Sequence, residues 1–292
     1  MKFRNIASYL MEPPLRPFLK WAGAKTQLVK NLRSLFPQGD FRFIEPFVGS
    51  GAVFLNNPYS SSVLSDTNED IINLYGALKA SPAEFISRCK KLFAPKNNDS
   101  GRFYELRDEF NSCTDVERRA SLFLYLNRYC FNGLCRYNTK GKFNTPFGRY
   151  KQPYFPEEEM QVFANKLVTA ELLKCDFRAA LSEAGRGDVV YCDPPYVPLT
   201  STANFTNYAA AGFTKDDQKA LRKLAFEASE RGAVVILSNH DTPFTRDLYR
   251  GAELFPVLVS RTISCDGQNR NKAKEIIAVF GRQSAVALEV RS

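Results

Sequence analysis

The sequence predicts an α/β fold, in which an open, mainly parallel sheet is covered by helices on both faces and interrupted by a mostly helical insertion. Two observations predict this fold. Short apolar runs alternate with helical patterns in both terminal parts of the chain, whereas residues 68–155 contain helical and loop patterns without a convincing buried strand. We therefore expect one domain formed by residues 1–67 and 157–292, and a second, inserted domain formed by residues 68–156.

The first part of the sheet domain contains two expected strands. Residues 41–48 run into the turn Gly49-Ser50-Gly51, and residues 63–66 end in an acid, Asp66. Glycines after a strand let the backbone approach a ligand, and an acid after the next strand can accept hydrogen bonds from ribose hydroxyls. Phe54 replaces the third glycine of the dinucleotide fingerprint. A nucleoside cofactor such as S-adenosylmethionine therefore fits better than a dinucleotide, and a purely structural turn is the alternative.

The insertion combines a helix with a basic, aromatic segment. A capping box at 114–117 predicts a helix that runs through Tyr129, and residues 136–147 resemble a polar hairpin or extended loop. Residues 127–151 contain six basic and six aromatic side chains and no acid. Basic groups neutralise phosphates and aromatic rings stack on bases. Together with the net charge of +9, this segment favours a nucleic-acid partner over a merely solvated basic loop.

After Tyr154 the alternation of strands and helices returns. Residues 214–231 form an amphipathic helix with a cap formed by Thr214 and Asp217, and Gly232 follows its end. Four more strands are expected, at residues 188–193, 233–239, 256–263 and 275–280. These strands complete the predicted sheet.

The tetrapeptide Asp193-Pro194-Pro195-Tyr196 follows the apolar run at residues 189–192, at an edge of the sheet where ligands bind in open α/β folds. Prolines lack an N–H, so nearby carbonyls are expected to be free acceptors. The Asp193 carboxylate and the Pro194 carbonyl can hold both hydrogens of an exocyclic amino group, while Tyr196 offers a flat face for a base. The nitrogen lone pair is then directed at an electrophile. A strand-end turn with a structural aspartate is the alternative.

Other classes of protein are disfavoured. The seven cysteines form no C-x-x-C pair and His240 is the only histidine, so we expect reduced thiols and no metal site. No signal peptide or apolar run of about 20 residues is present, so we expect a cytoplasmic protein without a membrane partner. No G-x-S-x-G motif supports hydrolase chemistry. Residues 200–213 are either a lid over the site or a plain surface loop.

Three motifs, in this order along the chain, resemble those of adenine-N6 DNA methyltransferases of the Dam type: residues 18–25 (FLKWAGAK), 45–51 (EPFVGSG) and 193–196 (DPPY). Further similar blocks lie at residues 126–137, 143–150 and 238–241, and the resemblance covers about residues 17–282. It implies a class I methyltransferase (Rossmann-like) fold with an inserted target-recognition domain. It also implies S-adenosylmethionine as cofactor and double-stranded DNA as partner, and we expect a monomer in solution.

The resemblance also assigns roles to single residues. Catalysis is expected at Asp193, Pro194 and Tyr196. The cofactor is expected at Trp21, Lys25, Gly49, Gly51, Asp66, Asp176, Phe177 and Asp193. Ala24 departs from the family, which often has glycine there, and we expect little loss from the added methyl group.

For the DNA, the resemblance implies a wedge and a set of base readers. Phe131 and Asn132 would fill the gap left by a flipped adenine, and Arg136 would read a guanine through O6 and N7. The usual tyrosine of the wedge is Phe131 here, which keeps the stacking surface without the hydroxyl. Contacts to the thymine methyl and to the outer guanine are implied for Leu134 and Pro146 and for Lys20, respectively. Phosphate contacts are implied for Arg107, Arg128, Asn138, Asn144, Arg149, Tyr150 and Lys151.

These readers predict methylation of adenine N6 in 5'-GATC-3' duplex DNA by base flipping. Four alternatives stay open at this point. The chain could methylate RNA or another recognition sequence, or a protein amide, although amide-modifying enzymes more often have Asn at the first position of the tetrapeptide. It could also be a non-catalytic DNA-binding regulator, which the presence of Asp66, Asp193 and Tyr196 disfavours.

Overall fold

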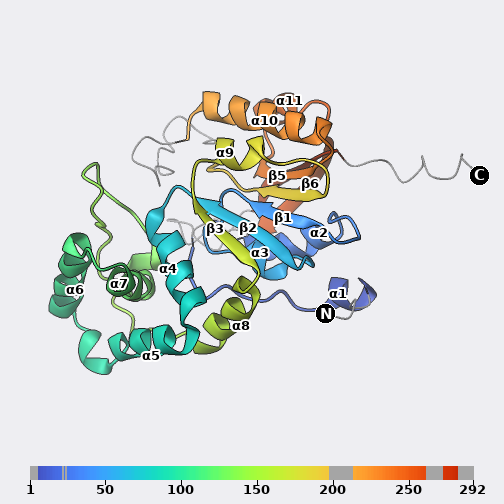
Figure 1. Ribbon diagram of the computed structural model, residues 1–292. Coiled ribbons are helices and arrows are strands. Elements are labelled where there is room, and N and C mark those ends of the chain that lie inside the picture. The colour runs from blue at the N-terminus through green and yellow to red at the C-terminus, as the bar shows by residue number, and fades with distance from the viewer. Residues whose placement is uncertain (1–5, 22, 24, 197–212, 261–271, 282–292) are drawn as a thin grey trace, which may run out of the picture.

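The computed structural model describes residues 6–21, 23, 25–196, 213–260 and 272–281. Its centre is a seven-stranded sheet with the strand order β3-β2-β1-β4-β5-β7-β6 (Figure 1). The strands are β1 (Arg42–Glu45), β2 (Ser61–Asp66), β3 (Ala170–Lys174), β4 (Asp188–Cys192), β5 (Val234–His240), β6 (Glu253–Ser260) and β7 (Lys272–Phe280). Strands β3, β2, β1, β4 and β5 are parallel, and β7 is antiparallel to both of its neighbours. The predicted open, mainly parallel sheet is therefore confirmed.

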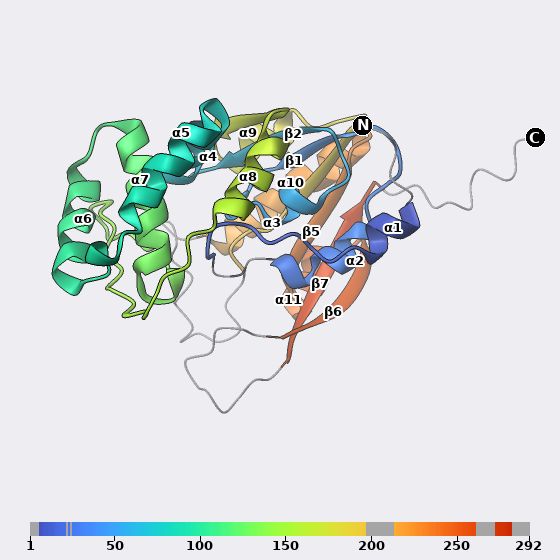
Figure 2. The same cartoon turned by 90° about the horizontal axis from the view of Figure 1, so that it is seen from below.

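Helices cover both faces of the sheet (Figures 1 and 2). Neighbouring strand residues contribute to opposite faces: Phe43 belongs to one apolar cluster and Ile44 to the other. On the Ile44 face lie α9 (Phe177–Ser182), α10 (Lys215–Glu230) and α11 (Pro243–Leu248). On the Phe43 face lie α2 (Val29–Arg33), α3 (Ala52–Asn56), α4 (Glu69–Ala80) and α8 (Glu157–Leu167).

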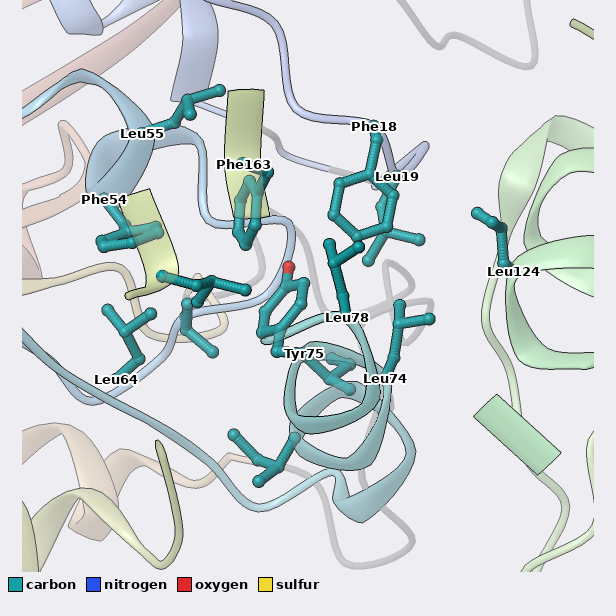
Figure 3. Close-up of a cluster of buried hydrophobic side chains, with 14 of the residues drawn as sticks. Phe18, Leu19, Phe54, Leu55, Leu64, Leu74, Tyr75, Leu78, Leu124 and Phe163 are labelled. Atoms are coloured by element: carbon teal, nitrogen blue, oxygen red, sulfur yellow. The ribbon is translucent and has the colours of Figure 1, made fainter. Parts of the chain in front are cut away.

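The core on the Phe43 face contains a close group of aromatic rings (Figure 3). Phe163 of α8 packs edge-on against Phe18 and Phe54, at centroid distances of 5.1 and 5.3 Å, and lies 4.8 Å from the ring of Tyr75. Aromatic pairs in such arrangements stabilise a core beyond the area that they bury. The segment that contains Phe18 is thereby fixed to the sheet domain just before Lys20 and Trp21.

A helical lobe lies beside the sheet, next to α4 (Figure 1). It contains α5 (Pro82–Leu92), α6 (Ser100–Ser112) and α7 (Val116–Tyr129), and α7 is buried over residues 120–129. Helix α4 packs against α7 and also against β2 and β3, so it belongs to both parts of the core. The remaining short helices are α1 (Ile6–Met11) and the 3-10 turns η1 (Lys25–Gln27), η2 (Pro95–Asn97) and η3 (Phe131–Gly133).

Residues 130–147 fold back as an irregular antiparallel hairpin. Antiparallel bridges pair Cys130 with Phe147 and Tyr137 with Phe143, and a turn closes between Asn138 and Lys142. We call residues 130–151 the recognition loop. The hairpin expected from the sequence is thus present, with two isolated bridges in place of a regular ladder.

Several expected boundaries differ from the structure. Strand β3 is absent from the expected strands because only Ala170 is buried in this edge strand, so no apolar run marks it. Helix α7 is capped by Asp115, which accepts a hydrogen bond from the Arg118 amide, and not by Thr114. The Thr214–Asp217 capping box of α10 is confirmed. Strand β6 begins at Glu253, earlier than expected, and residues 261–263 of its expected range lie outside the described residues. Ala24 and residues 200–212 of the expected lid or loop also lie outside them.

Lys166 makes the stability of this fold depend on pH. Its ammonium donates to the Asn57 carbonyl at 2.6 Å and lies 5.4 Å from the Phe54 ring centroid. Burial lowers the pKa of Lys166 to about 7. An unfolded lysine keeps its proton up to a pKa of about 10.4, so unfolding takes up a proton between these values and stability rises with pH in that window.

We therefore expect Lys166→Met to raise the free energy of unfolding near neutral pH. This gain should shrink toward about pH 10, by at most about 1.4 kcal/mol per pH unit. Urea unfolding of both proteins across this range measures the effect, with Lys219→Met as the control because Lys219 is exposed on α10. A gain that stays constant with pH would contradict the lowered pKa.

Candidate active site and DNA-reading surface

The parallel strands bring several polar side chains to one edge of the sheet. Asp66 ends β2, Glu45 ends β1 and Asp193 directly follows β4, while Ser238 and His240 lie at the end of β5. Because these strands run in the same direction, their carboxyl ends share one edge. The sequence placed Asp66 and Asp193 at this edge correctly.

Asp193 is the centre of a polar network. Its Oδ1 accepts a hydrogen bond from the Ser238 hydroxyl at 2.9 Å, and Ser238 is in turn bonded to the Tyr191 hydroxyl at 2.9 Å. The Lys25 ammonium lies 3.2 Å from the same carboxylate oxygen. Burial raises the pKa of Asp193, whereas Lys25 and Ser238 lower it. These contacts hold the carboxylate in one orientation.

The ring of Tyr196 is fixed beside Asp193. Its hydroxyl donates to Glu275 Oε2 at 3.0 Å, and the Tyr196 and His240 rings pack in a T-shaped arrangement at a centroid distance of 4.8 Å. The Lys25 ammonium lies over the Tyr196 ring, 4.2 Å from its centroid. Burial raises the pKa of Tyr196 well above its usual value, so the phenol is neutral at physiological pH. His240 and Glu275 thus help to position the ring, a role that the sequence did not reveal for Glu275.

The two proline carbonyls of the tetrapeptide differ. Pro195 was expected to offer a free carbonyl, but its oxygen accepts a hydrogen bond from Gln218 Nε2 at 2.9 Å. Gln218 is itself held by Asn239, whose amide donates to Gln218 Oε1 at 3.1 Å. The expectation is therefore wrong for Pro195, which is tied to α10 and β5. Pro194 is buried next to Asp193 and remains the acceptor predicted from the sequence.

The glycine turn after β1 is shaped by its protein neighbours. Gly49 and Gly51 have φ values of +44° and +67°, which favour glycine. A Cβ on Gly49 would lie 2.8 Å from Trp21 Nε1, so Trp21 itself makes the close approach there. Asp66 accepts a hydrogen bond from the Gly49 amide at 3.1 Å and Tyr75 donates to the Gly49 carbonyl at 2.6 Å. The turn, Trp21 and Asp66 therefore form one connected unit.

Glu45 is a further acid at this edge. Its side chain is buried, its Oε2 accepts a hydrogen bond from the Phe54 amide at 3.0 Å, and burial raises its pKa well above the usual value. It thereby joins the end of β1 to the first turn of α3. An acid inside the apolar run FRFIEPFV is the available signal, although the sequence alone gives this acid no role.

Asp176 and Phe177 lie at the start of α9. Asp176 caps this helix and pairs with Arg178, while Phe177 is buried and stacks on Phe47 at a centroid distance of 5.5 Å. Phe213 completes this aromatic group, 5.6 Å from Phe177. The structure therefore places an exposed carboxylate next to an apolar aromatic surface, at the carboxyl end of β3.

The expected wedge protrudes from the recognition loop. Phe131 is 51% exposed, and Asn132 has a left-handed backbone with φ of 53°. The Phe131 amide donates to the Pro146 carbonyl at 2.8 Å and the Asn132 amide donates to the Tyr150 hydroxyl at 2.9 Å. Backbone contacts thus hold the loop while leaving the two side chains at the surface.

The expected base readers lie around this wedge. Arg136 is exposed, and its Nε donates to Asn144 Oδ1 at 2.8 Å, which orients the guanidinium. Leu134 is half-buried and its carbonyl accepts a hydrogen bond from Thr145 at 2.6 Å, while Pro146 is exposed. The Lys20 ammonium lies 4.0 Å from the centroid of the Tyr150 ring.

The expected phosphate contacts have different surroundings. Arg149 and Lys151 are exposed, and Asn138 accepts hydrogen bonds from the Lys140 and Lys142 amides in its turn. Arg107 packs on the Tyr104 ring at 4.6 Å. Arg128 is only 9% exposed and donates to the Tyr154 carbonyl at 3.1 Å. The structure thus does not bring Arg128 to the surface with the others.

A sheet with this strand order, an antiparallel β7 and a D-P-P-Y tetrapeptide after β4 defines a class I methyltransferase that acts on an amino group. A family model described as D12 class N6 adenine-specific DNA methyltransferase matches residues 21–263, and the chain belongs to this family. It is thus an enzyme that uses a methyl donor to methylate adenine N6 in DNA.

Curated relatives agree with this assignment. A DNA adenine methylase of Serratia marcescens is 51% identical over 91% of this chain and 98% of its own length. A DNA adenine methylase of Vibrio cholerae is 49% identical over 91% of this chain and 96% of its own length, and one of Escherichia coli K12 is 46% identical over 91% and 95%.

Two further findings concern membranes and metals. None of the helices in the described ranges combines the length and apolar character needed to cross a bilayer. The same ranges contain no group of three or more His, Cys, Asp or Glu side chains arranged to hold a metal ion.

Proposed function

We propose that this enzyme transfers a methyl group from S-adenosylmethionine to adenine N6 in 5'-GATC-3' sites of duplex DNA, after flipping the adenine out of the helix. The observation that carries the chemical part is the oriented Asp193 carboxylate beside the fixed ring of Tyr196. The Lys25 ammonium lies against both groups. Lys25 Nζ therefore lies beside the Asp193 carboxylate and over the Tyr196 ring, which is where we place N6 of the flipped adenine.

In this proposal Asp193 and Pro194 accept hydrogen bonds from the two N6 hydrogens, which directs the nitrogen lone pair away from them. N6 would form its bond to the methyl carbon as the carbon–sulfur bond breaks, so S-adenosylhomocysteine leaves and one N6 proton is lost to Asp193 or to water. Tyr196 supports the flipped base by stacking, as its neutral, fixed ring allows. Lys25 gives up its place on Asp193 when the adenine enters. Preorganised acceptors of this kind need no rearrangement during the reaction.

The residues at the sheet edge fit S-adenosylmethionine. Asp66 accepts hydrogen bonds from the Gly49 and Asn68 amides, and its oxygens keep lone pairs for ribose hydroxyls. For the adenine ring of the cofactor we propose the aromatic group of Phe47, Phe177 and Phe213, in which Phe177 itself is buried, with the exposed Asp176 carboxylate as a nearby acceptor. Trp21, Lys25, Gly49 and Gly51 would surround the other end of the cofactor. When bound, the cofactor supplies a methyl group on a sulfonium, which is electrophilic without assistance from a metal.

For the DNA, the proposal divides the chain into a catalytic domain, residues 1–67 and 157–292, and a target-recognition domain, residues 68–156. The exposed wedge and the oriented guanidinium of Arg136 support the second assignment. The phosphate contacts then come from Arg107, Asn138, Asn144, Arg149, Tyr150 and Lys151, and we leave out the buried Arg128. Because one chain contains both domains, we propose that it acts as a monomer. We also propose that it acts in the cytoplasm.

The recognition sequence can be tested directly. Plasmid DNA from a host that lacks GATC methylation, incubated with the enzyme and S-adenosylmethionine, is expected to resist a nuclease that cuts only unmethylated GATC. A nuclease that cuts only methylated GATC should digest it. The same incubation with S-adenosylmethionine tritiated in its methyl group measures total methylation of the DNA. Tritium incorporation together with full cutting by the nuclease that needs unmethylated GATC would show an active enzyme that reads another sequence.

A further inference from the structure

Asn127 forms a buried junction between three segments that are distant in sequence. It lies at the end of α7 and is fully buried. Its Oδ1 accepts a hydrogen bond from the Lys20 amide at 2.9 Å, and its Nδ2 donates to the Lys20 carbonyl at 2.6 Å. The same Nδ2 is 3.3 Å from the Gly133 carbonyl and 3.4 Å from Cys135 Sγ. One amide thus holds Lys20 and the recognition loop together.

Gly133 closes this junction from the other side. A Cβ on Gly133 would collide with the Cβ of Lys20, and its φ of +67° also favours glycine. The Lys20 ammonium reaches the Arg128 carbonyl at 3.5 Å and the Tyr150 ring. Lys20 is therefore fixed at its backbone, at its Cβ and at its ammonium by the lobe that contains the recognition loop.

We propose that Asn127 is a positioning residue for sequence discrimination, which sets the place of Lys20 relative to the wedge residues Phe131 and Asn132. This inference rests on the proposed reading of the outer guanine by Lys20. Asn127 itself does not reach the DNA, because it is fully buried. It acts through the two backbone hydrogen bonds to Lys20, in which the amide oxygen accepts from the N–H and the amide nitrogen donates to the C=O.

A buried amide with four partners has a structural role in any case, so the test must separate positioning from stability. Asn57 is the matched control. It is also a buried asparagine, but its side chain bonds within its own turn, to the Phe54 carbonyl at 2.8 Å and the Tyr59 amide at 2.9 Å. Its loss should destabilise the fold without moving Lys20.

The experiment measures kcat/KM for duplexes that contain GATC and for duplexes altered only at the outer guanine. The discrimination ratio is kcat/KM for the GATC duplex divided by kcat/KM for the altered duplex. We expect Asn127→Ser to reduce this ratio by about tenfold, within the range for one lost base contact. Asn57→Ser should leave the ratio unchanged. Lys20→Ala should reduce the ratio as well, and adding Asn127→Ser to it should cause no further fall.

A second variant tests the same junction with Asn127 intact. Gly133→Ala is expected to push Lys20 aside and to reduce the ratio at the outer guanine, while discrimination at the guanine read by Arg136 stays within about twofold. The two variants perturb the junction from opposite sides, so folding of either one is sufficient for the test.

Wild-type discrimination in a folded Asn127→Ser or Gly133→Ala protein would overturn the proposal, and so would additive losses in the double variant. If the proposed GATC specificity itself is wrong, the result is different: the wild-type enzyme would then have the same kcat/KM for the GATC duplex and for the altered duplex.

Discussion

Replacing Asp193 by alanine is expected to reduce the rate of methyl transfer by at least about 10²-fold, which is the usual cost of removing one oriented group that stabilises a transition state. The variant loses the acceptor that orients N6, and the Lys25 ammonium is left without its ion-pair partner. DNA affinity should stay near normal, because Asp193 lies at the sheet edge and not in the recognition loop. Tritiated-methyl incorporation measures the rate, and filter binding measures the affinity.

Asp188→Asn is the matched control for this variant. Asp188 is a buried acid at the other end of the same strand, β4, where it pairs with Arg42 at 2.8 Å. Its replacement should lower stability and leave methyl transfer by the folded protein unchanged. Incorporation by Asp193→Ala above about a tenth of the wild-type value would argue against the role assigned to Asp193.

Replacing Arg136 by alanine is expected to lower discrimination at its guanine by about 1–3 kcal/mol, because a bidentate contact to O6 and N7 is lost. Arg136 is exposed and bonded only to Asn144 among the described residues, so the free energy of unfolding should change by less than about 0.5 kcal/mol. Competition between GATC duplexes and duplexes altered at that guanine measures the effect.

Lys142→Ala provides the comparison for Arg136→Ala. Lys142 is exposed at the tip of the same hairpin and would at most neutralise a phosphate. Its loss should weaken binding about equally for all sequences and reduce the salt dependence of binding. If Arg136→Ala behaves in the same way as Lys142→Ala, then Arg136 does not read a base.

The sheet could be predicted where strands are buried on both faces. Strand β4 consists entirely of buried residues, so its apolar run marks it clearly. The edge strand β3 exposes Glu171 and Lys174 and has no such run. The start of α7 could not be placed exactly because Thr114 and Asp115 are both good capping residues, and only the fold selects Asp115.

The candidate site could be predicted where its residues form short motifs. Asp193, Tyr196 and Asp66 follow strands, so strand direction alone brings them to one edge. Glu275 and Asn127 could not be found in this way, because their partners lie 79 and 107 positions away in the sequence. Pro195 shows the opposite error: its missing N–H was visible, but the Gln218 side chain that occupies its carbonyl was not.

The reversed direction of β7 has a consequence for how this centre is assembled. In a parallel strand, the last residues lie at the carboxyl edge of the sheet. In an antiparallel strand such as β7, the first residues lie at that edge. Glu275 lies near the start of β7, opposite His240 in the ladder, and reaches Tyr196 from there. The antiparallel direction of β7 thereby places Glu275 at the carboxyl edge of the sheet. There it orients the ring of Tyr196, which follows β4.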